Sequence, residues 1–321
     1  MPPNSYPATP AERDAWVLSR RGERNAVDPW RPHGFFVENE RDASGQIVPV
    51  ATVLLSNREC PWRCLMCDLW KNTLDETAPV GAIPAQIDFA LGQLPRSRQI
   101  KLYNSGSFFD AAAIPPADYP AIAERAVAFD NVIVESHPAL ISGRVLSFRD
   151  RVQGKLEVAV GLETANPIVL DLLNKRITLE SFKRAADFLR HHQISLRVFV
   201  LLKPPFLAED QAVEWARRSI DFAFDCGATV VSVIPTRFGN GALEALAGPG
   251  DFSPPKLRSV EAVLDYGIHL RRGRVFADLW DLAKFSECDE CFPARLERLR
   301  RMNDLQTRQS AVVCSRCGGT G

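Results

Sequence analysis

The sequence predicts an α/β protein whose main part is a partial TIM-type barrel of the (β/α)6 kind, with an N-terminal extension and a small C-terminal cysteine-rich metal module. Two observations predict the barrel. Short apolar runs alternate with amphipathic segments from about residue 49 to residue 284, as buried parallel strands and their covering helices do. About six such units in about 230 residues fit one barrel better than two separate folds. A third observation, the cysteine pairs beyond residue 284, predicts the metal module.

Each strand and helix of the barrel is expected at a definite place along the chain. The strands, rich in Val, Ile, Leu or Phe, are expected at residues 51–55, 99–103, 131–135, 156–161, 195–202, 229–234 and 274–277. The helices, with apolar residues at helical spacing, are expected at residues 85–94, 117–129, 179–192, 209–226 and 255–271. The predicted domains are therefore an extension over residues 1–48, a barrel over 49–284 and a cysteine module over 285–321.

The composition is that of an ordinary globular protein, with 46% hydrophobic and 24% charged residues in a chain of 321. Its 39 basic and 39 acidic residues balance, so no overall basic excess indicates nucleic-acid binding. No apolar run has membrane-spanning length, and the first 31 residues contain no apolar signal segment. We therefore expect a cytoplasmic protein without membrane contact, in which clustered cysteines indicate metal or cluster ligands and not disulfides.

The first cysteine cluster directly follows the first expected strand. Cys60, Cys64 and Cys67 form a C-x3-C-x2-C pattern in one loop, whereas an iron–sulfur cubane normally takes four cysteines. Three cysteine ligands leave one iron open to an exchangeable ligand. The loop leaves the carboxyl end of a barrel strand, where such folds build active sites. A structural zinc site with a distant fourth ligand is the alternative, although zinc loops usually pair cysteines as C-x2-C.

This motif and its place after the first barrel strand resemble the radical S-adenosylmethionine (SAM) superfamily. The resemblance implies a [4Fe–4S] cluster held by the three cysteines and SAM bound at the open iron. It implies reductive cleavage of SAM, usually to a 5′-deoxyadenosyl radical that abstracts hydrogen from a substrate. It also implies an external electron donor of the flavodoxin or ferredoxin type. The resemblance covers about residues 51–278.

Residues at the ends of later strands extend the resemblance to the SAM site. The family carries a glycine-rich loop that receives the SAM amino group, and the Asn104–Ser107 loop stands at that place without the usual carboxylate. Glu135 resembles a polar SAM or substrate contact, Glu163 resembles the ribose contact, and Met66 replaces an aromatic residue near the adenine. A plain β–α turn and helix-end charges are the alternatives for the loop and the two carboxylates. The expected cofactor-binding residues are Asn104, Ser105, Gly106, Ser107, Glu135, Glu163 and Met66.

Other segments look like the radical SAM subunit of archaeosine synthase, within the branch of elongator-type and methylthiotransferase enzymes. These segments include Asn174–Arg176 and Leu201–Phe206. The resemblance suggests a tRNA nucleoside as substrate and a partner subunit, whereas the balanced charge suggests a small metabolite. Lys203 and Glu135 are the expected catalytic residues, with a plain surface lysine as the alternative for Lys203. Arg197, on a strand between apolar neighbours, requires a partner such as a barrel-interior carboxylate.

The second cysteine cluster consists of two C-x2-C pairs. The metal ligands expected there are Cys288, Cys291, Cys314 and Cys317. Paired knuckles of this kind are typical of tetrahedral zinc, and an auxiliary [4Fe–4S] cluster is the alternative. The basic segment between the pairs, residues 292–308, is interpreted as a solvated helix face, with an RNA-contacting helix as the alternative.

Three functional hypotheses follow from these residues. The first is a radical SAM enzyme that abstracts hydrogen from a tRNA or small-metabolite substrate. The second keeps the cluster but transfers the aminocarboxypropyl group of SAM, which the cysteine motif does not exclude. The third is a non-catalytic metal- and RNA-binding protein, which would bind RNA with steep salt dependence and leave SAM intact.

Overall fold

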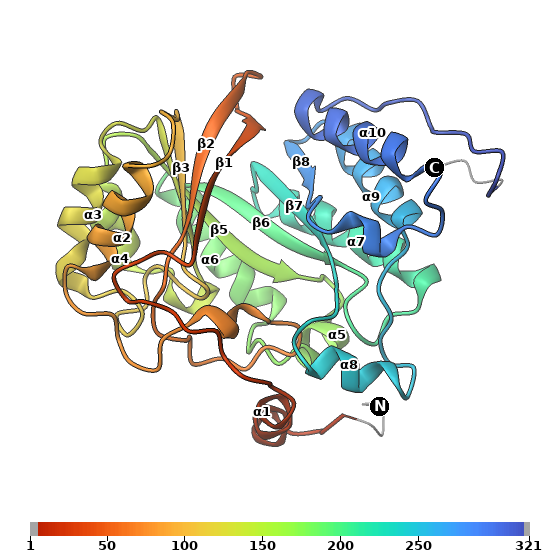
Figure 1. Ribbon diagram of the computed structural model, residues 1–321, viewed down its shortest axis with the longest axis horizontal. Coiled ribbons are helices and arrows are strands. Elements are labelled where there is room, and N and C mark those ends of the chain that lie inside the picture. Colours follow the sequence, from red (N-terminus) through yellow and green to blue (C-terminus); the bar gives the residue numbers. More distant parts are fainter. Residues whose placement is uncertain (1–5, 318–321) are drawn as a thin grey trace.

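The computed structural model describes residues 6–317, so the ends of the predicted extension and cysteine module lie outside the described residues. The described chain contains one curled eight-stranded sheet whose strand order follows the sequence (Figure 1). The first two strands are antiparallel, and every later pair is parallel. The strands are β1 (Gly34–Arg41), β2 (Ile47–Leu54), β3 (Gln99–Tyr103), β4 (Asn131–Glu135), β5 (Lys155–Glu163), β6 (Ser195–Leu202), β7 (Val230–Pro235) and β8 (Arg274–Ala277).

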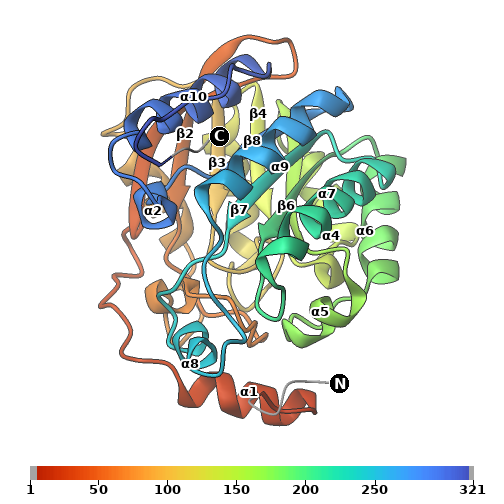
Figure 2. The same ribbon diagram turned by 90° about the vertical axis from the view of Figure 1, so that its right-hand side faces the viewer.

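Helices cover the outer face of this sheet, which confirms the predicted partial barrel (Figures 1 and 2). Successive side chains of each strand point alternately to the helix-covered outer face of the sheet and to the barrel interior. On β6, for example, Val198 and Val200 join the fully buried core under the helices, whereas Phe199 between them faces the interior and is half-buried. The covering helices are α2 (Ala82–Leu91), α3 (Tyr119–Ala126), α4 (Gly143–Arg149), α6 (Leu179–His191), α7 (Glu209–Asp225) and α9 (Leu257–Leu270).

The seven predicted strands are present: β3, β4, β6 and β8 have the predicted ends, and the ends of β2, β5 and β7 differ by a few residues. The strand β1 was not predicted, and it lies within the segment assigned to the N-terminal extension. Its inward positions carry Glu38 and Glu40, and these charges hide the alternation of polar and apolar residues that would indicate a strand. Four short helices were also not predicted: α1 (Pro10–Ser19), α4, α5 (Pro167–Leu172) and α8 (Ala242–Ala247).

A layer of buried charges fills the barrel interior near the amino ends of the strands. Lys101 donates to Glu40 at 2.7 Å, and Arg197 donates to both Glu40 and Glu157. Burial alone would raise the pKa of Glu40, but Arg197 and Lys101 outweigh burial and hold that pKa well below its usual range. The interior carboxylate partner expected for Arg197 is therefore present. Such a layer is costly to break, because removing one partner leaves an uncompensated buried charge.

The last helix, α10 (Phe292–Leu305), covers the free edge of the sheet beside β8. The side-chain amide of Asn303 exchanges two hydrogen bonds with the backbone of Ala277, at 3.0 and 2.9 Å. The amide of Gln306 does the same with Val275, at 2.8 and 2.9 Å. These amides replace the strand that β8 lacks on this side, and an exposed strand edge is otherwise prone to aggregation. In the described part of the chain, no helix is both long and apolar enough to cross a membrane.

Candidate functional site

The three cysteines of the first motif lie in the loop that follows β2, at the carboxyl edge of the sheet. None is in a disulfide, and each is partly buried. Burial raises the pKa of all three thiols, and the pKa of Cys67 reaches about 12. The charges of Cys60 and Cys67 raise the pKa of Cys64 further. Thiols with raised pKa values lose their protons readily only beside a cation, which a bound metal or cluster would supply.

The N-terminal segment is tied to this cysteine loop by ion pairs. Glu59, directly before the first cysteine, accepts from Arg21 at 2.8 Å and from Arg63 at 3.0 Å, and it also pairs with Arg24. The backbone amide of Asn25 donates to the carbonyl of Lys71, at 2.8 Å, just beyond the loop. Residues 21–25 thus lie across the cysteine loop and hold both its ends.

The predicted glycine-rich loop packs against the first cysteine. A Cβ on Gly106 would lie 3.1 Å from the Cβ of Cys60, so only glycine permits this approach without a shift. The backbone amide of Asn104 donates to Glu135 at 2.6 Å, and amides of Ser105 and Gly106 also bond to that carboxylate. Burial nevertheless keeps the pKa of Glu135 above its usual value. The structure thus brings the predicted loop, Glu135 and Cys60 together.

The side chain of Asn104 carries the most direct sign of a missing ligand. It is fully buried, yet neither its amide nitrogen nor its carbonyl oxygen has a hydrogen-bond partner. An unpaired buried polar group costs about 1–3 kcal/mol, so native proteins rarely keep one without a role. The donor and acceptor of Asn104, beside Cys60 and its loop, fit a polar ligand with both acceptors and donors, as the amino and carboxylate groups of SAM provide.

Glu163 forms a buried ion pair with a residue to which the sequence analysis gave no role, Lys175. Burial alone would lower the pKa of Lys175, but Glu163 and the thiol of Cys64 outweigh burial and raise that pKa. A Cβ on Gly161 would lie 2.1 Å from the Lys175 nitrogen and 2.2 Å from a Glu163 oxygen, so this glycine makes room for the pair. The sequence alone gives no signal for Lys175 in the site, because its approach to the cysteines depends on the fold between residues 163 and 175.

His137 forms part of the same site but is not poised to exchange protons. Its ring stacks on Trp62 of the cysteine loop, with centroids 3.6 Å apart. The Nδ1 atom accepts from the amide of Ala139 at 3.2 Å, so the proton lies on Nε2, which donates to the carbonyl of Lys175 at 2.9 Å. Burial and the charge of Lys175 lower the pKa of His137 to about 4. His137 therefore stays neutral and ties the cysteine loop to the segment that carries Lys175.

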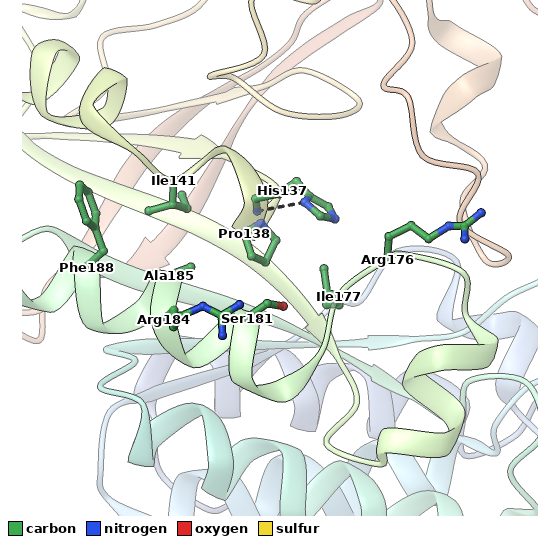
Figure 3. A pocket seen from close by; sticks show the side chains of 10 residues that line it. His137, Pro138, Ile141, Arg176, Ile177, Ser181, Arg184, Ala185 and Phe188 are labelled. Carbon is green, nitrogen blue, oxygen red and sulfur yellow. Dashed lines mark hydrogen bonds between the residues drawn. The ribbon is translucent and has the colours of Figure 1, made fainter. Parts of the chain in front are cut away.

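A cavity of about 330 Å³ lies on the side of His137 toward α6. Pro138, Ile141 and Phe188 provide apolar walls, and the guanidinium of Arg184 extends along it beside Ser181 (Figure 3). Arg176 also borders the cavity, but its guanidinium points away and pairs with Asp14 (Figure 3). The cavity has the size of a small ligand site.

Two other predicted residues lie in different surroundings. Lys203 donates to Glu209 at 2.6 Å and to Ser253 at 2.8 Å, so its ammonium is engaged away from the cysteines. Met66 packs, partly buried, among apolar side chains that include those of α5.

Backbone strain is concentrated at this edge of the barrel, where several non-glycine residues have positive φ, a conformation that costs of order 1–3 kcal/mol for each residue. They are Ser105, Glu163, Asn174, Arg176, Lys203 and Phe206.

The second cysteine cluster comes together in space. The sulfurs of its four cysteines, the set predicted as metal ligands, all lie within 4.8 Å of one another. The sulfurs of Cys291 and Cys317 are 3.9 Å apart. Zinc–sulfur bonds of about 2.3 Å in a tetrahedron would place the sulfurs about 3.8 Å apart. The group therefore has the dimensions of a site for one tetrahedral ion.

The basic helix between the two cysteine pairs, α10, turns two of its arginines inward. Arg295 pairs with Glu261 of α9, and Arg298 donates to Asp265, also on α9, at 2.6 Å. Both arginines are buried, so the interpretation as a wholly solvated face was wrong for them, although Arg300 and other basic residues of the segment are exposed. These pairs dock the cysteine module on the barrel.

The chain has measurable relatives among known proteins, although no family model matches it. It is 30% identical over 226 residues to archaeosine synthase subunit beta of Methanosarcina acetivorans, which covers 66% of this chain and 65% of that protein. It is 35% identical over 172 residues to archaeosine synthase subunit beta of Thermococcus kodakarensis, which covers 51% of this chain and 53% of that one. The chain thus spans between half and two thirds of the length of these two relatives.

The fold also has a solved counterpart. The structure of the archaeal Methanocaldococcus infernus Elp3 is similar with a TM-score of 0.51 at 14% identity, over 67% of this chain and 58% of that one. This likeness shows a shared fold. The two sequence relatives bear the name of the enzyme that segments such as Leu201–Phe206 resemble.

Proposed function

We propose that this protein is a radical SAM enzyme in which Cys60, Cys64 and Cys67 hold a [4Fe–4S] cluster at the carboxyl edge of the barrel. When bound, the cluster and SAM supply a 5′-deoxyadenosyl radical that abstracts hydrogen from the substrate. The observation that carries the proposal is the buried, unpartnered amide of Asn104 in a loop packed on Cys60. A site for a structural metal alone would leave that amide without a use.

The surrounding residues suit the polar groups of SAM. The Asn104 side chain offers both a donor and an acceptor, and Glu135 holds the loop amides so that the loop keeps its shape. Lys175 lies close enough to Cys64 and Cys67 to offset the negative charge of their thiolates. Its ammonium is also placed to bind a carboxylate, and Glu163 beside it can accept hydrogen bonds from ribose hydroxyls.

Glu135 and Lys203 were also predicted to be catalytic residues, and this role stays a prediction for both. The carboxylate of Glu135 is occupied by backbone amides, which favours a positioning role. The ammonium of Lys203 would have to leave Glu209 and Ser253 before it could contact a substrate.

The C-terminal cysteines are proposed to hold one structural zinc ion. The separation of 3.9 Å between two of their sulfurs supports this, because it matches a tetrahedral site of about 3.8 Å. An auxiliary [4Fe–4S] cluster binds each cysteine to a different iron, so its sulfurs must stand farther apart than the four here. All four positions are filled by protein, which is typical of structural and not catalytic zinc.

The substrate and partners are proposed from the relatives. Two relatives are named as a subunit beta of archaeosine synthase, which supports a partner subunit and a tRNA nucleoside substrate, with a small metabolite as the alternative. An external flavodoxin- or ferredoxin-type protein would supply the electron. We propose that the enzyme works in the cytoplasm, where free thiols persist.

Cofactor reconstitution tests this function directly. The protein would be purified without oxygen, loaded with iron and sulfide, reduced with dithionite and incubated with SAM, and the products identified by mass spectrometry. We expect 5′-deoxyadenosine from the wild type and none from the variant with Cys60→Ala, Cys64→Ala and Cys67→Ala. Methylthioadenosine would indicate aminocarboxypropyl transfer instead. Intact SAM in the presence of a full cluster would contradict the proposal and favour a metal- and RNA-binding protein.

A further inference from the structure

Two buried asparagines hold the backbone of the cysteine loop from opposite sides. Asn240, 3% exposed, lies between β7 and α8, and its side-chain amide donates to the carbonyls of Leu65 and Cys67 at 2.7 and 3.4 Å. Its side-chain oxygen accepts from the amide of Leu243, at 2.9 Å, at the start of α8. One side chain thus joins the cysteine loop to the loop that follows β7.

Asn174 makes the corresponding contact from the β5 side. It is 1% exposed, and its side-chain amide donates to the carbonyl of Arg63 and to the carboxylate of Asp14, both at 2.8 Å. Its neighbour Leu173 accepts from the amide of Leu65 at 2.9 Å. Asn174 has a φ of 57°, a backbone conformation that asparagine tolerates better than most residues.

The two asparagines therefore occupy three alternate carbonyls of the motif, those of residues 63, 65 and 67. These carbonyls stand on both sides of Cys64 and at Cys67 itself. If these carbonyls were free, the peptide planes of residues 60–67 could rotate and move the thiols out of position, whereas fixed peptide planes hold the thiols in one orientation. Each such hydrogen bond contributes modestly to global stability, so its main effect here is on the geometry of the ligands.

We propose that Asn240 and Asn174 are positioning residues that pre-organise Cys64 and Cys67 to take up the cluster. The proposal rests on the proposed function, since it concerns the same cluster, but it can be tested before any cluster is present. It goes beyond the cysteine motif because neither asparagine provides a ligand atom, and both come from loops far away in sequence.

The variants Asn240→Asp and Asn240→Ala separate loop holding from helix capping. An ionised aspartate keeps an oxygen for the amide of Leu243 but offers no donor to the carbonyls of Leu65 and Cys67. Alanine removes both interactions. Asn303→Ala is the matched control, because it also removes two side-chain amide bonds, of 2.9 and 3.0 Å, but on α10.

Hydrogen exchange of the iron-free protein is the first measurement. The amides of Leu65 and Cys67 are hydrogen-bonded and serve as reporters. Both Asn240 variants should exchange these amides about tenfold faster than the wild type, the equivalent of about 1.4 kcal/mol. Asn303→Ala should leave them unchanged. Equal exchange in Asn240→Asp and wild type would overturn the proposal, and a change in Asn240→Ala alone would leave Asn240 only as the cap of α8.

The second measurement follows the cluster itself in reconstituted protein. Both Asn240 variants should lose iron to a chelator about tenfold faster than the wild type and broaden the electron paramagnetic resonance signal of the reduced cluster. Wild-type retention and an unchanged signal would overturn the proposal. If the wild type takes up no cluster while the exchange results hold, the proposed function fails and the loop-holding role of Asn240 stands.

Discussion

Replacing Gly161 with alanine tests the ion pair beneath the cysteines. The new Cβ would lie 2.1 Å from the nitrogen of Lys175 and 2.2 Å from an oxygen of Glu163, well inside van der Waals contact. The backbone at Gly161 does not require positive φ, so alanine introduces no backbone strain. Both clashing atoms end flexible side chains, and we therefore expect the pair to separate without the sheet unfolding.

The size of the effect follows from the burial of the pair. Removing one partner of a buried ion pair costs about 3–5 kcal/mol, because the other charge stays buried alone. In Gly161→Ala both charges remain and their side chains can relax. We therefore expect the free energy of unfolding to decrease by only about 2 kcal/mol. That loss corresponds to a decrease of about 0.5–1 M in the urea concentration at the unfolding midpoint. Lys175→Ala should cost about 3–5 kcal/mol in the wild type and less in the Gly161→Ala background, because coupled residues are not additive.

Urea unfolding of the iron-free protein measures both changes without involving the cofactor. Gly143→Ala is the matched control, since a Cβ on Gly143 at the start of α4 meets no atom within 4 Å. It should unfold at the wild-type midpoint or slightly above it, because alanine restricts the unfolded chain. If Gly161→Ala unfolds at the wild-type midpoint, or if the two substitutions are additive, the inferred packing of the pair is wrong.

Two further predictions concern His137 and the cysteine module. The pKa of His137 is lowered to about 4 in the folded protein against about 6.5 when unfolded, so its contribution to stability is present above pH 6.5 and lost as the pH falls to about 4. The difference in free energy of unfolding between wild type and His137→Gln should therefore shrink by about 2–3 kcal/mol over that window. A constant difference between their urea unfolding midpoints from pH 7.5 to 4 would refute this. Cys314→Ser should abolish binding of one zinc ion per chain, measured by a colorimetric chelator, and should expose the amides of Val275 and Ala277 to exchange as α10 loosens; retention of zinc would contradict the four-cysteine site.

Local features of the sequence determined much of the barrel and both cysteine groups. The spacing of Cys60, Cys64 and Cys67 within one loop fixes which ligands can act together, whatever surrounds them. Apolar runs such as residues 195–202 predict buried strands, because a strand covered on both faces needs little else. The glycine-rich loop was located by its place after a strand, and the structure brings its Gly106 against Cys60.

Only the tertiary structure decided which distant side chains meet. The pairing of Lys175 with Glu163 needs the turn through α5, and the inward direction of Arg295 and Arg298 needs α9 beside α10. The strand β1 was hidden because its inward Glu40 is compensated by Lys101 and Arg197 from other strands. A buried charge looks like a surface residue in the sequence, since its partner is chosen by sheet register and not by spacing. Local periodicity reports which faces are apolar, whereas long-range electrostatic pairing exists only after the chain has folded.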